Sequence, residues 1–203
     1  MLEHAGKRLF DLAGAALLLL VVSPLMALAA LLVYADSGRP VFFGQWRMGR
    51  GGRPFRCWKV RTMIPDAEQS LDRDHGLRRA YVANGYKLPN VCDPRVTRVG
   101  RWLRQRYLDE LPQLLNVLAG EMSLVGPRPV VEEELGEYAP HQSELLSVKP
   151  GLVGAWASLG PQRPAYPIRA VLELDYVRAR SLSRDLTILI RSVPVVLRGQ
   201  TDS

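Results

Sequence analysis

Residues 12–35 read LAGAALLLLVVSPLMALAALLVYA and contain no charged side chain. As an α-helix this segment would be about 36 Å long, enough to cross a hydrocarbon core of about 30 Å. A cleaved signal peptide fits poorly, because the run is too long and no clean cleavage site precedes a mature domain. A buried core helix also fits poorly, because apolar core helices are usually much shorter. The segment therefore predicts a membrane helix.

The Ser23-Pro24 pair divides this segment evenly, with 11 uncharged residues on each side. Proline lacks a backbone N–H and clashes with the carbonyl four residues earlier, so the helix is expected to kink at this pair. The Ser23 hydroxyl can donate to a nearby backbone carbonyl. A kinked spanning helix remains an alternative, because proline is tolerated in such helices.

Basic residues flank the apolar segment on both sides, with Lys7 and Arg8 before it. After it come Arg39, Arg47, Arg50, Arg53, Arg56, Lys59 and Arg61. Positive charge marks the cytoplasmic side of membrane segments, so both ends are expected in the cytoplasm. Each half-helix is about 16 Å long, so a hairpin-like kink would reach the region of the bilayer midplane and return. We therefore expect residues 1–36 to form a re-entrant membrane helix hairpin rather than a span.

The overall composition restricts the class of protein. The chain has 203 residues, 47% of them apolar, so one folded domain is expected. Two cysteines are too few for a disulfide scaffold, and three scattered histidines argue against a zinc enzyme. The net charge of +7 predicts an anionic partner. A nucleic acid would account for this charge but not for the uncharged segment, so no nucleic-acid partner is expected.

Residues 37–203 are expected to form a cytoplasmic catalytic domain that begins with a β-hairpin. The stretches 41–46 and 54–60 predict its two strands, and Gly49, Gly51 and Gly52 supply the turn.

Helices are expected in the rest of this domain. One lies near residues 65–80, and the helical spacing of apolar residues resumes after residue 93. Residues 165–180 and 184–198 predict amphipathic helices, a pattern that suits a membrane surface but also an ordinary core. The predicted fold class is therefore α+β and mostly helical, with membrane-surface amphipathic helices around a cytoplasmic active site.

Two adjacent carboxylates, Asp109 and Glu110, precede Pro112. Pro112 belongs in a first helical turn, so Asp109 could serve only as an N-cap. The surrounding charges suggest chemistry, because a run of arginines precedes the pair and a rigid connector, Gly126-Pro127-Arg128-Pro129, follows it. This run is Arg95, Arg98, Arg101, Arg104 and Arg106. Arginine matches phosphate oxygens, and a carboxylate binds Mg²⁺ or acts as a nucleophile in phosphoryl transfer. With the membrane segment, this indicates a phosphate carried on, or transferred to, a lipid.

Ordered motifs along nearly the whole chain carry a family resemblance. They are Lys7-Arg8-Leu9-Phe10-Asp11, Ser23-Pro24, the segment 36–43, Lys59-Val60-Arg61-Thr62-Met63, Asp66-Ala67, the segment 93–100, Leu108-Asp109-Glu110-Leu111-Pro112-Gln113-Leu114, the segment 122–129 and Val148-Lys149-Pro150-Gly151. With these motifs the chain resembles a bacterial sugar transferase, a small monotopic polyprenyl-phosphate phosphoglycosyl transferase.

The resemblance implies a re-entrant helix broken at Ser23-Pro24, at the cytoplasmic face of the bacterial inner membrane. It implies Mg²⁺-dependent transfer of a phosphosugar from a UDP-sugar to a polyprenyl (undecaprenyl) phosphate. This would be the first membrane step of glycoconjugate or exopolysaccharide assembly. Asp109 corresponds to the nucleophile that forms a phosphosugar intermediate and expels UMP, and to a metal contact. Glu110 corresponds to its partner acid.

Other residues correspond to family positions as well. Lys59, Arg104 and Arg128 match basic residues for phosphate, and Asp175 matches a recurrent acidic position. The chain departs from the family pattern in three places. Tyr107 stands where the family usually has a small hydroxyl residue, and residues 152–157 after the Lys-Pro-Gly motif differ from the usual sequence. Residues 143–146 lack an arginine that the family commonly has.

The sequence leaves open the sugar, the pathway and the oligomeric state, monomer or homodimer. It also leaves two competing functions. A membrane-anchored scaffold would release no nucleotide from a UDP-sugar, and a glycosyltransferase acting on polyprenyl phosphate would release UDP instead of UMP.

Overall fold

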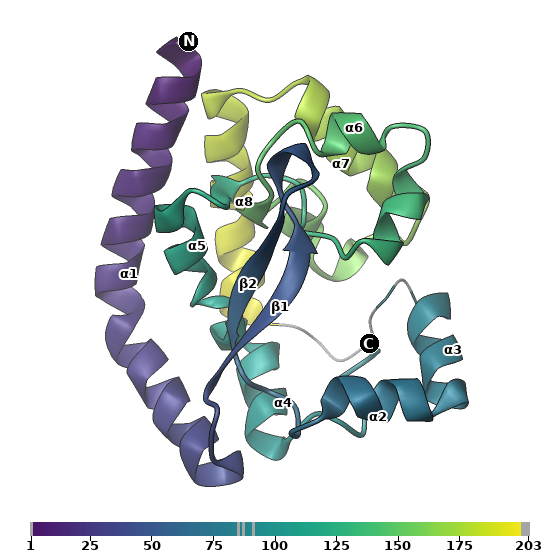
Figure 1. The fold of residues 1–203 in the computed structure, drawn as a ribbon. Coiled ribbons are helices and arrows are strands. Elements are labelled where there is room, and N and C mark those ends of the chain that lie inside the picture. The colour runs from purple at the N-terminus through teal and green to yellow at the C-terminus, as the bar shows by residue number, and fades with distance from the viewer. Residues whose placement is uncertain (1, 85, 87, 91, 200–203) are drawn as a thin grey trace.

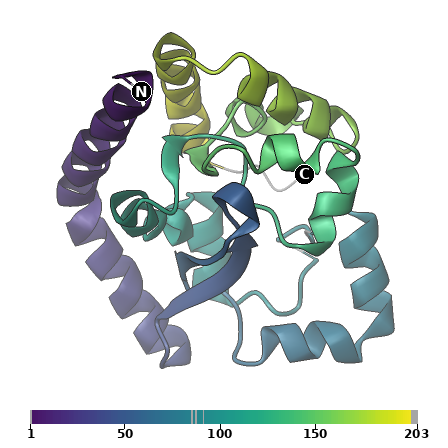
Figure 2. The ribbon, with the colours of Figure 1, turned by 45° about the horizontal axis from the view of Figure 1, so that its top comes forward.

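The computed structural model describes residues 2–84, 86, 88–90 and 92–199 (Figure 1). In chain order its elements are α1 Leu2–Ser37, β1 Phe42–Met48, η1 Arg50–Gly52, β2 Pro54–Val60, α2 Ala67–Arg73, α3 His75–Ala83, α4 Arg98–Gln105, η2 Leu108–Glu110, α5 Gln113–Ala119, β3 Ser123–Val125, η3 Glu133–Tyr138, α6 Gln142–Leu145, β4 Gly151–Val153, η4 Ala157–Gln162, α7 Ile168–Arg178 and α8 Leu182–Arg198. This confirms a mostly helical fold with little sheet. Helix α1 runs along one side of the molecule, and α2 and α3 lie on the opposite side (Figure 2).

Helix α1 continues through Pro24 as one bent helix (Figure 1). The missing N–H of residue 24 would have donated to the Leu20 carbonyl. The Ser23 hydroxyl donates to that carbonyl instead, at 3.0 Å. The segment expected as a helix hairpin is a single bent helix, in which the Ser23 hydroxyl occupies the carbonyl that Pro24 leaves without its helical donor.

Helix α1 buries a narrow stripe of small residues and exposes its large ones. Ala15, Ala29 and Val33 are buried, whereas Leu20 and Leu31 are 74% and 66% exposed. Residues 5–37 are long and apolar enough to cross a membrane, and only 11% of the most apolar stretch is buried. A core helix of a soluble protein would bury most of its apolar surface, so this exposure argues against that alternative.

A buried polar cluster attaches the first turns of α1 to the domain. The Lys7 ammonium lies 2.8 Å from Asp11 and 2.9 Å from Asp185 of α8. The Asp11 carboxylate, which is almost fully buried, also accepts from the Ser123 hydroxyl and the Leu124 N–H, each at 3.1 Å. Burying these charges is tolerated because each is paired and hydrogen-bonded.

The other end of α1 is attached to the same domain. The Arg61 guanidinium donates to the Ser37 and Gly38 carbonyls at 2.6 and 2.9 Å. Ala29 and Val33 pack against Val60 at the end of β2. Both ends of α1 are therefore fixed to one body.

The predicted hairpin is confirmed. Strands β1 and β2 pair antiparallel, with Phe42 opposite Val60 and Met48 opposite Pro54. Gly51 and Gly52 in the turn have φ of 70° and 72°, a conformation that glycine adopts without strain.

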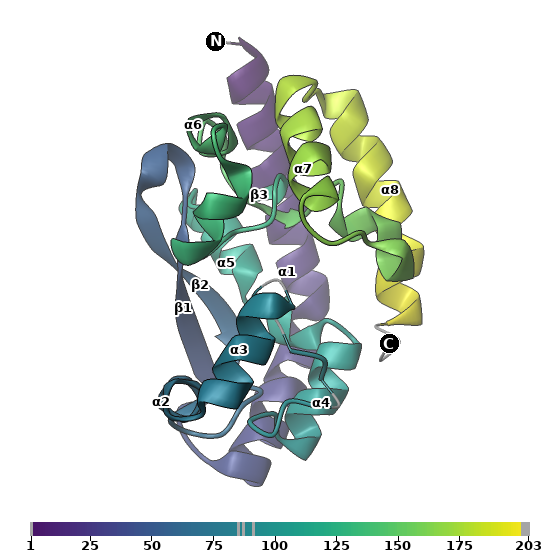
Figure 3. The ribbon, with the colours of Figure 1, turned by 90° about the vertical axis from the view of Figure 1, so that its right-hand side faces the viewer.

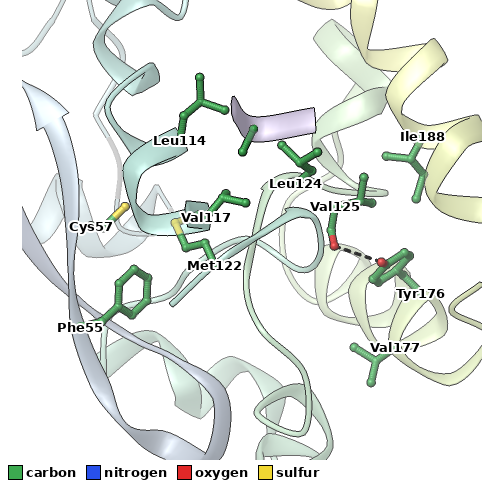
Figure 4. Packing of buried hydrophobic residues seen from close by; sticks show 11 residues of the cluster. Phe55, Cys57, Leu114, Val117, Met122, Leu124, Val125, Tyr176, Val177 and Ile188 are labelled. Carbon is green, nitrogen blue, oxygen red and sulfur yellow. Dashed lines mark hydrogen bonds between the residues drawn. The ribbon is translucent and has the colours of Figure 1, made fainter. Parts of the chain in front are cut away.

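A central cluster joins the hairpin to the C-terminal helices (Figure 4). Phe55 and Cys57 of β2 lie against Val117 of α5. On the other side the Tyr176 hydroxyl donates to the Val125 carbonyl at 3.2 Å.

Two further strands, β3 and β4, pair in parallel and were not predicted. Their pairing brings the connector that follows β3 beside the Lys149-Pro150-Gly151 turn that precedes β4.

The helix predicted near residues 65–80 is two helices, α2 and α3, because the Asp74 side chain caps α3 by accepting from the N–H groups of Gly76 and Leu77. The C-terminal helices α7 and α8 lie where they were predicted (Figure 3). Helix α8 buries Asp185 and exposes apolar side chains on its outer face, including Leu186 and Leu197.

We predict that Asp11→Ala destabilises the protein by about 3 kcal/mol, because it leaves buried partners of the Asp11 carboxylate without their acceptor. The measurement is thermal unfolding in detergent micelles. Glu144→Ala serves as the control, because it removes the exposed Glu144–Arg178 pair and should change the melting temperature little. Equal melting temperatures for the two variants would contradict the anchoring role of Asp11.

Candidate active site

The acidic pair lies in the short helix η2, between α4 and α5. Tyr107 begins η2 in the left-handed region, with φ of 56°, and turns the chain so that Asp109 points inward. Asp109 is 6% exposed, whereas Glu110 is partly exposed. The N-cap positions of η2 and α5, both within the described residues, are Tyr107 and Pro112. Neither helix has a side-chain cap hydrogen bond. The interpretation of Asp109 as a simple N-cap is therefore wrong.

Two predicted phosphate-binding residues lie beside the acidic pair. The Lys59 ammonium, on β2, forms an ion pair with Glu110 at 2.9 Å. The Arg104 Nε donates to the Thr62 hydroxyl at 2.7 Å, which holds the guanidinium at the end of α4. The hairpin and α4 thus bring both cations to η2.

Burial dominates the electrostatics of Asp109. It raises the pKa of the Asp109 carboxyl, and the neighbouring Glu110 adds to that rise. The charges of Lys59 and Arg104 oppose it without cancelling it. Burial also lowers the pKa of Arg104. A buried carboxylate beside partly desolvated cations is typical of a reactive site.

Arg128 is the third predicted phosphate-binding residue. It is half-buried in the connector after β3. Burial lowers the pKa of Arg47, and the Arg128 charge lowers it further. Burial raises the pKa of Tyr107, although the positive charges of Arg163 and Arg128 lower it. The charge of Arg128 therefore influences the pKa of one residue of β1 and of one residue at the start of η2.

Asp175 lies elsewhere. Its side chain is 61% exposed and forms an ion pair with Arg184 of α8. The structure thus brings Lys59 and Arg104 to the acidic pair, and the charge of Arg128 reaches the neighbouring Tyr107. It places Asp175 at the α7–α8 junction, paired with Arg184.

Two further charged residues were not predicted from the sequence: Glu173, the buried carboxylate of α7, and Arg163. Glu173 is 1% exposed. A detectable signal existed, since Glu173 falls among the apolar positions of α7 and four residues after Arg169. The Arg163 Nε donates to the Gly160 carbonyl at 2.8 Å, its guanidinium lies 5.1 Å from the centre of the Trp156 ring, and its charge lowers the pKa of Tyr107.

The residues present fit a magnesium ion held jointly with substrate. Across the described part of the chain, no three His, Cys, Asp or Glu side chains could hold a metal by themselves. Magnesium commonly takes one or two carboxylates and completes its shell with water and substrate phosphates. The adjacent carboxylates of Asp109 and Glu110 match that requirement.

Comparison with known proteins identifies the family. Residues 2–199 match the family model described as bacterial sugar transferase. The chain therefore belongs to the bacterial sugar transferase family.

Curated relatives have names from lipid-linked sugar transfer. A UDP-galactose-lipid carrier transferase of Erwinia amylovora is 41% identical, over 95% of this chain and 40% of the relative. The exopolysaccharide production protein ExoY of Rhizobium meliloti is 43% identical, over 94% of this chain and 85% of the relative. A UDP-glucose:undecaprenyl-phosphate glucose-1-phosphate transferase of Caulobacter vibrioides is 40% identical, over 94% of this chain and 69% of the relative. The chain spans less than half the length of some relatives, including the first of these.

We predict that Asp109→Asn is at least as stable as the parent protein at neutral pH. Because the folded-state pKa of Asp109 is raised, ionising this residue costs stability as pH rises through its unfolded and then its folded pKa. The advantage of the Asn variant should therefore shrink as the pH falls below the folded-state pKa. Thermal unfolding across a pH series measures it, and a variant less stable than the parent at neutral pH would contradict a raised pKa.

Proposed function

We propose that this protein transfers a sugar 1-phosphate from a UDP-sugar to a polyprenyl phosphate such as undecaprenyl phosphate, releasing UMP. The observation that carries the proposal is the buried Asp109 carboxylate, which caps no helix and lies among Glu110, Lys59 and Arg104. The names of the relatives support the same chemistry, because they include galactose and glucose phosphate transfer to a lipid carrier.

The proposed reaction has two displacements. A carboxylate oxygen of Asp109 attacks the β-phosphorus of the UDP-sugar, and the bond to the bridging oxygen breaks, so UMP leaves with the bonding electrons. An oxygen of the polyprenyl phosphate then attacks the same phosphorus. The aspartyl–phosphorus bond breaks, and Asp109 is regenerated as a carboxylate.

The charged neighbours have distinct proposed tasks. Lys59 and Arg104 neutralise phosphate oxygens as charge builds up on the leaving group, which requires no movement because both are already held in place. Arg128 binds phosphate from the opposite side through its planar fork. Glu110 positions Lys59 through their ion pair. Mg²⁺, held by Asp109 and Glu110 with the substrate phosphates, would supply further neutralising charge.

We also propose that α1 is re-entrant at the inner membrane, with the active site on the cytoplasmic face. The contacts of Lys7 and Asp11 at one end and of Ser37 at the other lie on one domain. A spanning helix would separate its ends by the bilayer thickness and leave one side of this polar domain in lipid. The outward apolar face of α8 would lie on the same membrane surface.

The covalent step predicts a mass adduct on the intact protein. Incubation with Mg²⁺ and a panel of UDP-sugars, without lipid acceptor, should add one phosphosugar to the wild-type chain. Asp109→Asn should form no adduct and lose turnover by orders of magnitude, because an amide cannot supply the attacking oxygen. Full turnover in that variant, or lipid product without adduct, would contradict the covalent mechanism.

The released nucleotide separates the competing functions. We expect UMP from the correct UDP-sugar, released before lipid binds. Release of UDP would indicate a glycosyltransferase. Release of no nucleotide from any UDP-sugar, with the protein folded, would favour a membrane scaffold.

The topology predicts that cysteines introduced at positions 4 and 52 are both protected from a membrane-impermeant reagent added to intact cells. Labelling of position 4 alone would indicate a spanning helix. Pro24→Ala restores the N–H that α1 lacks, straightens the helix and should shift some molecules toward that spanning state. Permeabilised cells provide the control that both cysteines can react.

A further inference from the structure

The connector that carries Arg128 is fixed from the strand side. The Gly126 N–H donates to the Val153 carbonyl at 3.0 Å, and the Gly151 N–H donates to the Pro127 carbonyl at 2.8 Å. The first bond continues the β3–β4 pairing past the end of β3, whereas the second folds the connector back toward the start of β4. They hold the first half of the connector but leave the backbone N–H of Arg128 for another partner.

Helix α7 supplies that partner. The Arg128 N–H donates to a carboxylate oxygen of Glu173, at 3.2 Å. The Tyr138 hydroxyl donates to the other oxygen. Glu173 is completely enclosed, and burial raises the pKa of its carboxyl. Keeping such an acid in a protein interior is costly, and here its bonds lead to the residue proposed to bind phosphate.

The hairpin fixes the second half of the connector. Arg47 of β1 donates to the Pro129 carbonyl at 3.2 Å, and the Met48 N–H donates to the Val130 carbonyl at 2.9 Å. Both backbone N–H groups of the connector and the carbonyls of Pro127 and Pro129 are therefore held, by β4, α7 and β1 in turn.

A second layer of contacts fixes Glu173 itself. The Arg169 Nε lies 3.7 Å from Glu173, and Arg169 also pairs with Glu134 at 2.7 Å. The Arg169 guanidinium lies over the Trp156 ring, 4.5 Å from its centre. Glu173 thus has no room to change rotamer without disturbing this layer.

We propose that Glu173 is a positioning residue for the transfer reaction: it holds the Arg128 backbone so that the guanidinium faces the acidic pair before substrate binds. This rests on the proposed function of Arg128. Pro127 and Pro129 limit the backbone on either side, and the Glu173 bond sets the peptide between them. Glu173, which is far from Asp109 in sequence, would thereby influence phosphate binding through the backbone amide of Arg128.

The test combines Glu173→Leu, which has no acceptor, with Glu173→Gln, whose side-chain carbonyl can still accept from Arg128. Glu173→Leu should lower kcat/KM for UMP release by about 10- to 100-fold, because a misplaced binding group costs that much. Glu173→Gln should retain most of the activity. Val177→Ala, a buried change on the same helix, controls for loss of stability alone.

A double-variant cycle distinguishes positioning from general support. If Glu173 acts through Arg128, adding Glu173→Leu to Arg128→Ala should cause no further loss, because the two residues form one unit. The proposal would be overturned if the losses of kcat/KM in Glu173→Leu and Arg128→Ala multiplied in the double variant. It would also be overturned if Glu173→Gln and Glu173→Leu lost equal activity. If Glu173→Leu fails to fold, Tyr138→Phe removes the neighbouring donor and should show the same non-additivity with Arg128→Ala.

Amide hydrogen exchange at Arg128 provides a readout that does not depend on catalysis. Exchange of this N–H should speed up in Glu173→Leu and remain slow in Glu173→Gln and Val177→Ala. Unchanged exchange in Glu173→Leu would overturn the positioning role even if activity fell. Slow exchange in the parent protein together with full activity of Arg128→Ala would instead contradict the proposed function of Arg128.

Discussion

The buried Asp11 carboxylate is the interaction on which the arrangement of this molecule depends. It belongs to the apolar helix, yet it accepts from Ser123 and Leu124 of β3 and pairs with Lys7. Strand β3 leads directly into the connector that carries Arg128. This carboxylate therefore ties the first turns of the apolar helix to the strand that leads to the connector.

The elements with strong local signals could be predicted from sequence. The uncharged segment, the glycine turn of the hairpin and the C-terminal helices were all found where the pattern placed them. The bend at Pro24 and the hydrogen bond of the Ser23 hydroxyl were expected, but a hairpin was predicted where the structure has one continuous helix. Strands β3 and β4 were missed because each has three residues, too few for a periodic pattern.

The candidate site was predictable only in part, because its members are joined by long-range contacts. Asp109, Glu110, Lys59, Arg104 and Arg128 stood out as charges in unusual settings. Asp175 stood out too, but the buried acid on that helix is Glu173, two residues earlier. Only the packing of α7 against the connector distinguishes them. Elements distant in sequence, α1 and β2, likewise pack against η2, where burial raises the pKa of Asp109.

A helix held by both ends on one domain has a mechanical consequence for the bilayer. On the proposed topology, α1 occupies space among the lipids of the cytoplasmic leaflet and leaves the opposite leaflet almost undisturbed. Such a wedge relieves packing stress where the cytoplasmic leaflet is convex, and it adds stress where that leaflet is concave. On this topology, the bent shape of α1 would make local membrane curvature, and not only lipid identity, a determinant of where the protein resides.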